Sequence, residues 1–148
     1  MKRILVALDS SPRAGAVLDT AVRIASAMPG CKLVLFHSVG LPPELPASVL
    51  GYVDGNLTDI LANKARADID ALAATVPKEL IERVEVLLGV PWQAICREAT
   101  ERDVDLIVIG SHGYGVIDRF LGTTAAKIVN HTDRSVLVVR PPVVATAI

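Results

Sequence analysis

The sequence contains little cysteine, no long hydrophobic run and almost no net charge. Its two cysteines, Cys31 and Cys96, form no C-x-x-C pattern and no cluster with histidine, which argues against a zinc site or a disulfide framework. We predict that both are reduced and mostly buried. No apolar stretch approaches the ~20 residues of a membrane-spanning helix, and the first apolar run is too short for a secretory signal. We therefore expect a cytoplasmic protein with no membrane partner.

The charges also speak against nucleic acid as a partner. Fifteen basic and sixteen acidic residues give a formal charge of −1, whereas proteins that bind nucleic acid usually carry clustered lysine and arginine. The 148 residues suit one domain, which we place over 1–148, and hydrophobic residues make up 51% of them. A chain of this size and composition can bury a full core without disulfides or a structural metal.

Short apolar runs alternate along the chain with segments of helical periodicity. The expected strands are 3–8, 32–39, 82–88, 105–109 and 135–140. Most are nearly continuous in Val, Ile and Leu, as strands of a parallel sheet covered on both faces are. The run 82–88 is more polar and partly alternating, which favours a place at the sheet edge.

Four helices fit between these strands. Ser10 or Ser11 can cap the first, with Pro12 in its first turn, and Pro77 ends the second. The apolar positions that we expect to face inward are Val17, Ala21, Ile24 and Met28; Leu57, Leu61, Ala65, Ile69, Leu72 and Val76; Trp92, Ile95 and Ala99; and Ala125, Ile128 and Val129. The alternating order predicts an α/β fold: an open five-stranded parallel sheet with helices on both faces, Rossmann-like.

The end of the fourth strand carries the clearest sign of ligand binding. Three glycines follow within six residues, in Gly110-Ser111-His112-Gly113-Tyr114-Gly115, and Gly122-Thr123-Thr124 then opens a helix. Glycines let backbone amides approach a ligand, and free amides at a helix start favour phosphate. Neither the Walker A nor the G-x-G-x-x-G pattern is present. On spacing alone, a phosphate cradle and a tight surface turn both remain open.

Three further polar residues are candidates, and for two of them a binding role and a structural role both remain open. Asp9, at the end of the first strand, could accept hydrogen bonds from a ribose or help to cap the first helix. His112, in the glycine-rich loop, could donate to a phosphate or face solvent. We expect His37, at the end of the second strand, to be partly buried with its hydrogen bonds satisfied.

Four separated segments, in order, resemble the universal stress protein family over essentially the whole chain. They are ILVALDSSP, LVLFHSV, GVPWQAICREATERDVDLIVIGSHG and LGTTAAKIVNHTDRSVLVVR. ATP-binding members of the family carry G-x2-G-x9-G-[ST]. Here Gly110-x2-Gly113 and Gly122-Thr123 are intact, but the intervening Tyr114–Leu121 has eight residues.

The resemblance implies a strand order of 3-2-1-4-5, a homodimer formed through the C-terminal strand, and an ATP site that uses Mg2+. It places Ala7 and Leu8 near the adenine, Asp9 at the ribose, and Ser38 at an adenine contact that is usually apolar. The residues implied at the backbone and phosphates of the nucleotide, with His112 added from its place in the loop, are Ile109, Gly110, His112, Gly113, Gly122, Thr123 and Thr124.

Three functions fit these residues. The first is a dimeric, ATP-binding stress-response regulator. The second is a slow ATPase or self-phosphorylating protein; efficient phosphoryl transfer needs a base, a metal carboxylate and a cation, and no lysine lies in the cradle. The third is a dimeric interaction module that has lost ATP through its shortened loop.

Overall fold

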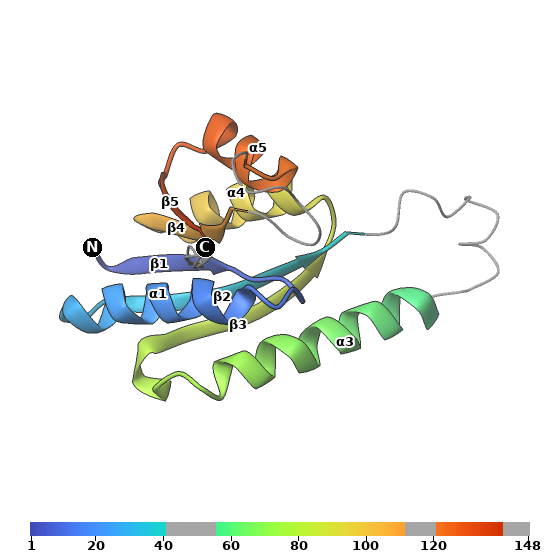
Figure 1. Ribbon diagram of the computed structural model, residues 1–148, viewed down its shortest axis with the longest axis horizontal. Coiled ribbons are helices and arrows are strands. Elements are labelled where there is room, and N and C mark those ends of the chain that lie inside the picture. The colour runs from blue at the N-terminus through green and yellow to red at the C-terminus, as the bar shows by residue number, and fades with distance from the viewer. Residues whose placement is uncertain (41–55, 112–120, 141–148) are drawn as a thin grey trace, which may run out of the picture.

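The computed structural model describes residues 1–40, 56–111 and 121–140 (Figure 1). The strands are β1 (Arg3–Ala7), β2 (Lys32–Val39), β3 (Ile81–Leu88), β4 (Leu106–Gly110) and β5 (Ser135–Val139). The α-helices are α1 (Ala14–Ala27), α3 (Asn56–Ala73), α4 (Pro91–Glu101) and α5 (Thr123–His131), and a short 3-10 helix, η1, covers Lys78–Leu80.

The five strands form one parallel sheet in the order β3-β2-β1-β4-β5. The predicted fold class and strand order are thereby confirmed. β1 is central, and it pairs with β2 from Arg3↔Lys32 onward and with β4 from Ile4↔Leu106 onward. After β3, the chain therefore crosses β2 and β1 to add β4 on the other side. The strand order reverses between β1 and β4, which is where open α/β sheets bind ligands.

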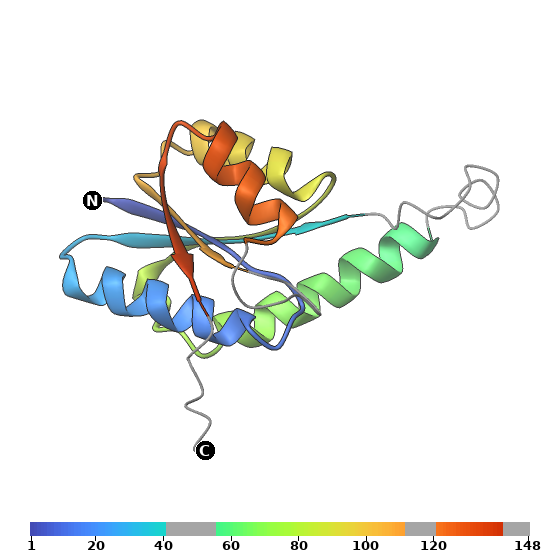
Figure 2. The ribbon, with the colours of Figure 1, turned by 45° about the horizontal axis from the view of Figure 1, so that its top comes forward.

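Alternate side chains of the strands pack into two separate hydrophobic cores, one on each face of the sheet. Ile4, Val6 and Leu8 of the first strand segment face α1 and α3, whereas Leu5 and Ala7 face α4 and α5. Figure 2 shows the two helix pairs on opposite faces of the sheet. Burial on both faces explains why the strand sequences are nearly continuous in apolar residues.

Several local expectations were wrong. α1 begins after Arg13, with no side-chain capping bond, and Met28 at its end is exposed. α3 ends at Ala73, so the buried Val76 lies beyond it rather than on its stripe. Val129 of α5 is 45% exposed and is not a core residue. Apart from the start of α1, each error concerns the last apolar position of a helical run, where a turn or the neighbouring element decides burial.

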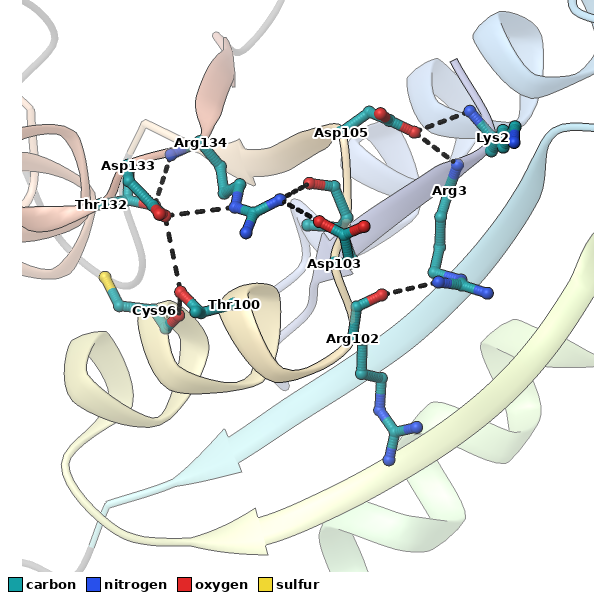
Figure 3. Close-up of polar contacts among 11 residues, drawn as sticks. Lys2, Arg3, Cys96, Thr100, Arg102, Asp103, Asp105, Thr132, Asp133 and Arg134 are labelled. Carbon is teal, nitrogen blue, oxygen red and sulfur yellow. Dashed lines mark hydrogen bonds and ion pairs between the residues drawn. The ribbon is translucent and has the colours of Figure 1, made fainter.

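The amino ends of the strands are tied together by polar contacts (Figure 3). The Asp105 carboxylate accepts hydrogen bonds from the backbone amides of Lys2 and Arg3, at 2.7 and 3.0 Å. These two bonds hold the pKa of Asp105 below its usual range. Arg134 donates to the Asp103 carboxylate at 2.7 Å. The first, fourth and fifth strands are thus cross-linked at this end.

A second polar cluster joins α4 to the edge strand β3. Arg102, which directly follows α4, donates to the Glu98 carboxylate on that helix and, at 2.9 Å, to Glu85 on β3. Burial raises the pKa of Glu98, and its Glu85 neighbour raises it further. This cluster lies on the α4 side of the sheet, away from the carboxyl ends of β1 and β4.

The two edges of the sheet differ. β3, as expected from its polar pattern, is one edge, and β5 is the other. Within the described ranges, β5 has β4 on one side and no strand on the other, and its residues Val136, Leu137, Val138 and Val139 are only half-buried. None of the described helices combines the length and the apolar character that crossing a lipid bilayer demands.

Candidate functional site

A cavity of about 250 Å3 opens at the carboxyl ends of the central strands. It is bounded by the ends of β1, β2 and β4 and by the first turns of α1, α4 and α5. The cavity therefore lies at the point where the strand order reverses, and helix amino ends from both layers converge on it.

The turn from β1 into α1 is held by its own side chains. Leu8 extends the strand pairing by donating its amide to the Phe36 carbonyl at 2.8 Å. The Asp9 carboxylate then accepts the amide of Ser11 at 2.9 Å, and the Ser11 hydroxyl accepts the amide of Arg13 at 3.3 Å. Asp9 stays exposed at the cavity, with its carboxylate oriented by this turn. It stabilises the turn without directly capping α1.

The start of α5 forms the opposite side of the site. Gly122 precedes the helix, and its amide donates to the Ser111 carbonyl at 2.7 Å, which holds the helix start beside the end of β4. The first amides of α5, from Thr123 onward, have no carbonyl partner within the helix. With the hydroxyls of Thr123 and Thr124, they give this wall an excess of hydrogen-bond donors.

The end of β2 carries two buried polar side chains that face opposite sides of the sheet. Ser38 lines the cavity and is 9% exposed, and its Oγ has no hydrogen-bond partner among the described residues. His37 is also buried, and its Nδ1 has no partner among them either. The expectation that His37 would have its hydrogen bonds satisfied holds only in part: its ring bonds to the Ala65 backbone, but Nδ1 has no partner among the described residues.

Burial lowers the pKa of His37, because a charged imidazole loses its hydration there. The carboxylates of Asp9 and Asp68 act in the opposite direction, and Lys64 acts with burial. The net effect favours a neutral ring close to the Asp9 end of the site.

The cavity brings together nine of the eleven residues predicted from the sequence. They are Ala7, Leu8, Asp9, Ser38, Ile109, Gly110, Gly122, Thr123 and Thr124. The other two, His112 and Gly113, lie outside the described residues. The nine come from four places in the sequence, and the fold gathers them at one edge of the sheet.

Sequence reasoning missed eight residues that line the cavity. They are Ser11, Arg13, Ala14, Val17, Pro91, Ile95, Ser111 and Ala125. Ser11 and Arg13 follow directly after the predicted strand end, so their position was a usable signal. Ile95 was expected only as a core residue, because a helical stripe does not tell which of its members reach past the end of a sheet.

The chemistry of the lining suits an anionic ligand with an apolar part. Ala14, Val17, Pro91, Ile95 and Ile109 supply apolar surface. Arg13 is the one cation and Asp9 the one carboxylate among the described lining residues. Nowhere in the described ranges do three or more His, Cys, Asp or Glu side chains gather as metal ligands. Phosphate groups would therefore be held chiefly by amides, hydroxyls and a helix end.

Comparison with known proteins gives a consistent result. The sequence profile of the Universal stress protein family matches residues 1–140. The chain is 32% identical to Universal stress protein A homolog 1 of Coxiella burnetii over 139 residues, which is 93% of this chain and 95% of that protein.

Solved structures show the same fold. Universal stress protein UspA from Lactobacillus plantarum has a TM-score of 0.78 and 29% identity, over 94% of this chain and 97% of that one. The universal stress protein from Archaeoglobus fulgidus, solved in complex with dAMP, has a TM-score of 0.58 and 22% identity, over 93% of this chain and 97% of that one.

Proposed function

Because the chain belongs to the universal stress protein family, we propose that it is a cytoplasmic, homodimeric stress-response regulator that binds ATP in the cavity at the carboxyl ends of β1 and β4. One observation carries this proposal. Residues expected at the base, the ribose and the phosphates come from four places in the sequence and line a single cavity. The complex of the Archaeoglobus fulgidus protein with dAMP makes adenine nucleotides the first ligands to test.

The donor set of the cavity fits a polyphosphate. Amides and hydroxyls at the start of α5 stabilise phosphate oxygens, and Arg13 at the start of α1 adds positive charge. Mg2+ usually keeps several waters and binds through substrate phosphates, so it requires few protein carboxylates. Asp9 is then free to accept hydrogen bonds from the ribose.

The direct test is to find and measure the nucleotide. Purified protein is denatured and the released small molecules are separated by chromatography; the stripped protein is then titrated calorimetrically with ATP, with and without Mg2+. We expect adenine nucleotide to be released, ATP to bind and any hydrolysis to be slow. Neither carry-over nor heat at millimolar ATP would overturn the proposal in favour of an interaction module without nucleotide.

A single substitution locates the phosphates. Thr124→Val removes a hydroxyl at the start of α5 while keeping the shape of the side chain. We expect ATP to bind about 5- to 10-fold more weakly, as a lost hydrogen bond to a charged group predicts, and adenosine to bind unchanged. Thr20→Val, on α1 and outside the cavity lining, is the matched control. An equal loss for adenosine would place the phosphates elsewhere.

The dimer is proposed through β5. No described strand pairs with its outer side, and its valines and leucine are half-buried, so that it offers backbone groups and apolar area that a second copy could cover. Light scattering on the purified protein is expected to give the mass of a dimer. Val138→Lys should shift it to a monomer, whereas Ile60→Lys, at an exposed position on α3, should not. A wild-type monomer at millimolar concentration contradicts the assembly.

A further inference from the structure

We propose that Ser38 recognises the edge of the bound base through a hydrogen bond from its hydroxyl. The inference rests on the proposed function, which it deepens by assigning one group of the ligand to one side chain. Two observations carry it: the state of the Ser38 hydroxyl, and the position of β2 relative to the other walls of the cavity.

The burial of the Ser38 hydroxyl destabilises the fold when no ligand is bound. Ser38 is 9% exposed, and its Oγ is shielded from solvent without a partner among the described residues. Its surroundings are apolar: it lies opposite Leu87 in the β2–β3 register, and Pro91 and Ile95 line the same cavity. A buried hydroxyl without a hydrogen bond destabilises the fold, and an alanine of nearly the same shape avoids that cost. A ligand in the cavity that forms the missing hydrogen bond would explain why position 38 is a serine and not an alanine.

The order of the strands says which part of a nucleotide reaches Ser38. β2 lies on the side of β1 that is away from β4. Ser38 on β2, Asp9 after β1, and Gly110 with the start of α5 beyond β4 therefore follow one another along the sheet edge. Neighbouring strands are about 4.8 Å apart, so β2 and β4 are separated by roughly 10 Å, a distance that one nucleoside phosphate spans.

The chemistry of these three places then assigns the three parts. Helix amides and threonine hydroxyls at α5 suit phosphate, and the Asp9 carboxylate suits sugar hydroxyls. The base is left for the β2 end, between the apolar side chains of Pro91 and Ile95. A serine hydroxyl both donates and accepts, and rotation about χ1 moves it among three staggered positions. It can therefore pair with the edge of adenine that carries the ring nitrogen N7 and the exocyclic amino group.

The experiment compares the binding of four ligands by wild type, by Ser38→Ala and by one control variant. Wild type and Ser38→Ala are titrated calorimetrically with AMP, with purine riboside monophosphate, which lacks the amino group, with 7-deaza-AMP, which lacks one ring nitrogen, and with dAMP, which lacks the 2′-hydroxyl. Ser26→Ala, at an exposed position in α1, is the matched control. Thermal unfolding of each protein is measured without ligand.

We expect Ser38→Ala to bind AMP about 5- to 10-fold more weakly and to unfold about 2–4 °C higher without ligand. The opposite signs are the signature, because replacing a serine that served only the fold would lower the melting temperature and leave AMP affinity unchanged. The difference between wild type and variant should disappear with one of the two base analogues and persist in full with dAMP.

The possible failures are distinguishable. If wild type binds none of the four nucleotides, the proposed function fails and this inference fails with it. If wild type binds AMP and Ser38→Ala binds it within twofold, the inference alone is wrong. It is also wrong if the difference persists with both base analogues, if it disappears with dAMP, or if the unliganded variant is less stable than wild type.

Discussion

The amino and carboxyl ends of the strands differ in how their polar groups are paired. At the amino end, backbone amides and charged side chains are paired: Asp105 accepts the amides of Lys2 and Arg3 at the start of β1, and Arg134 holds the turn before β4 (Figure 3). At the carboxyl end, a cavity separates the strands from the helix starts, and His37 and Ser38 are buried with unpaired atoms. Paired polar groups are thus concentrated at the closed end, and polar groups that a ligand could satisfy lie at the open end.

Substitution of Asp9 is expected to have the largest effect, and it should act on binding alone. Asp9→Asn keeps an oxygen that can accept the Ser11 amide, so the turn into α1 should survive. It removes the charge that strengthens hydrogen bonds from the ribose, and we expect AMP to bind about 10- to 100-fold more weakly in calorimetry. Asp19→Asn, at an exposed position of α1, is the control. If Asp9→Asn retains affinity within twofold, the ribose lies elsewhere.

Substitution of Asp105 should give the reverse result. Asp105→Ala removes the acceptor of two backbone amides, and because the site is exposed we expect a loss of about 1 kcal/mol in the free energy of unfolding. AMP affinity should not change, because Asp105 is at the far end of the strands. Chemical denaturation and calorimetry measure the two quantities.

The pH dependence and a control sharpen the Asp105 experiment. The pKa of Asp105 is lowered in the folded protein, chiefly by the amide of Lys2, so its stabilisation is present above the unfolded pKa of about 3.9 and is lost as pH falls through the folded value. Wild type and variant should therefore converge in acid. Asp70→Ala, which breaks only an exposed ion pair with Arg66, should cost less. A loss of AMP affinity in Asp105→Ala would show that the two ends are coupled.

Much of the fold could be predicted from the sequence because burial on both faces leaves an unmistakable pattern. The five strands were located within about a residue at each end, and the start of α5 was placed correctly after Gly122. The order of the strands in the sheet could not be predicted from the apolar runs, because a run does not show which other strands it pairs with. Only the family resemblance supplied that order. The ends of helices were the weakest part: Val76 is buried but lies beyond the end of α3, and Val129 continues the apolar spacing of α5 at an exposed position.

The residues of the site, too, could be predicted from the sequence only in part. Asp9, Gly110 and Gly122 could be proposed because they follow strands or precede a helix, and the topology brings such ends together. Ile95 could not, because its periodicity is that of any core residue. The unpaired state of the Ser38 hydroxyl could not be foreseen either, since it depends on which apolar side chains of α4 and β3 surround it.

The smallest of the expected effects is a loss of stability at low pH that arises from His37, at the carboxyl end of the strands. Because burial lowers the pKa of His37 in the folded protein, its contribution to stability is complete above the unfolded pKa of about 6.5 and is lost as pH falls through the folded value. The melting temperature of wild type should fall between pH 7.5 and 5.5, and that of His37→Gln should fall less. Glu98, whose pKa burial raises, contributes alike to both proteins, so the difference between them isolates His37. His131→Gln, at an exposed position of α5, is the control, and parallel pH profiles of wild type and His37→Gln would rule out the histidine as the source.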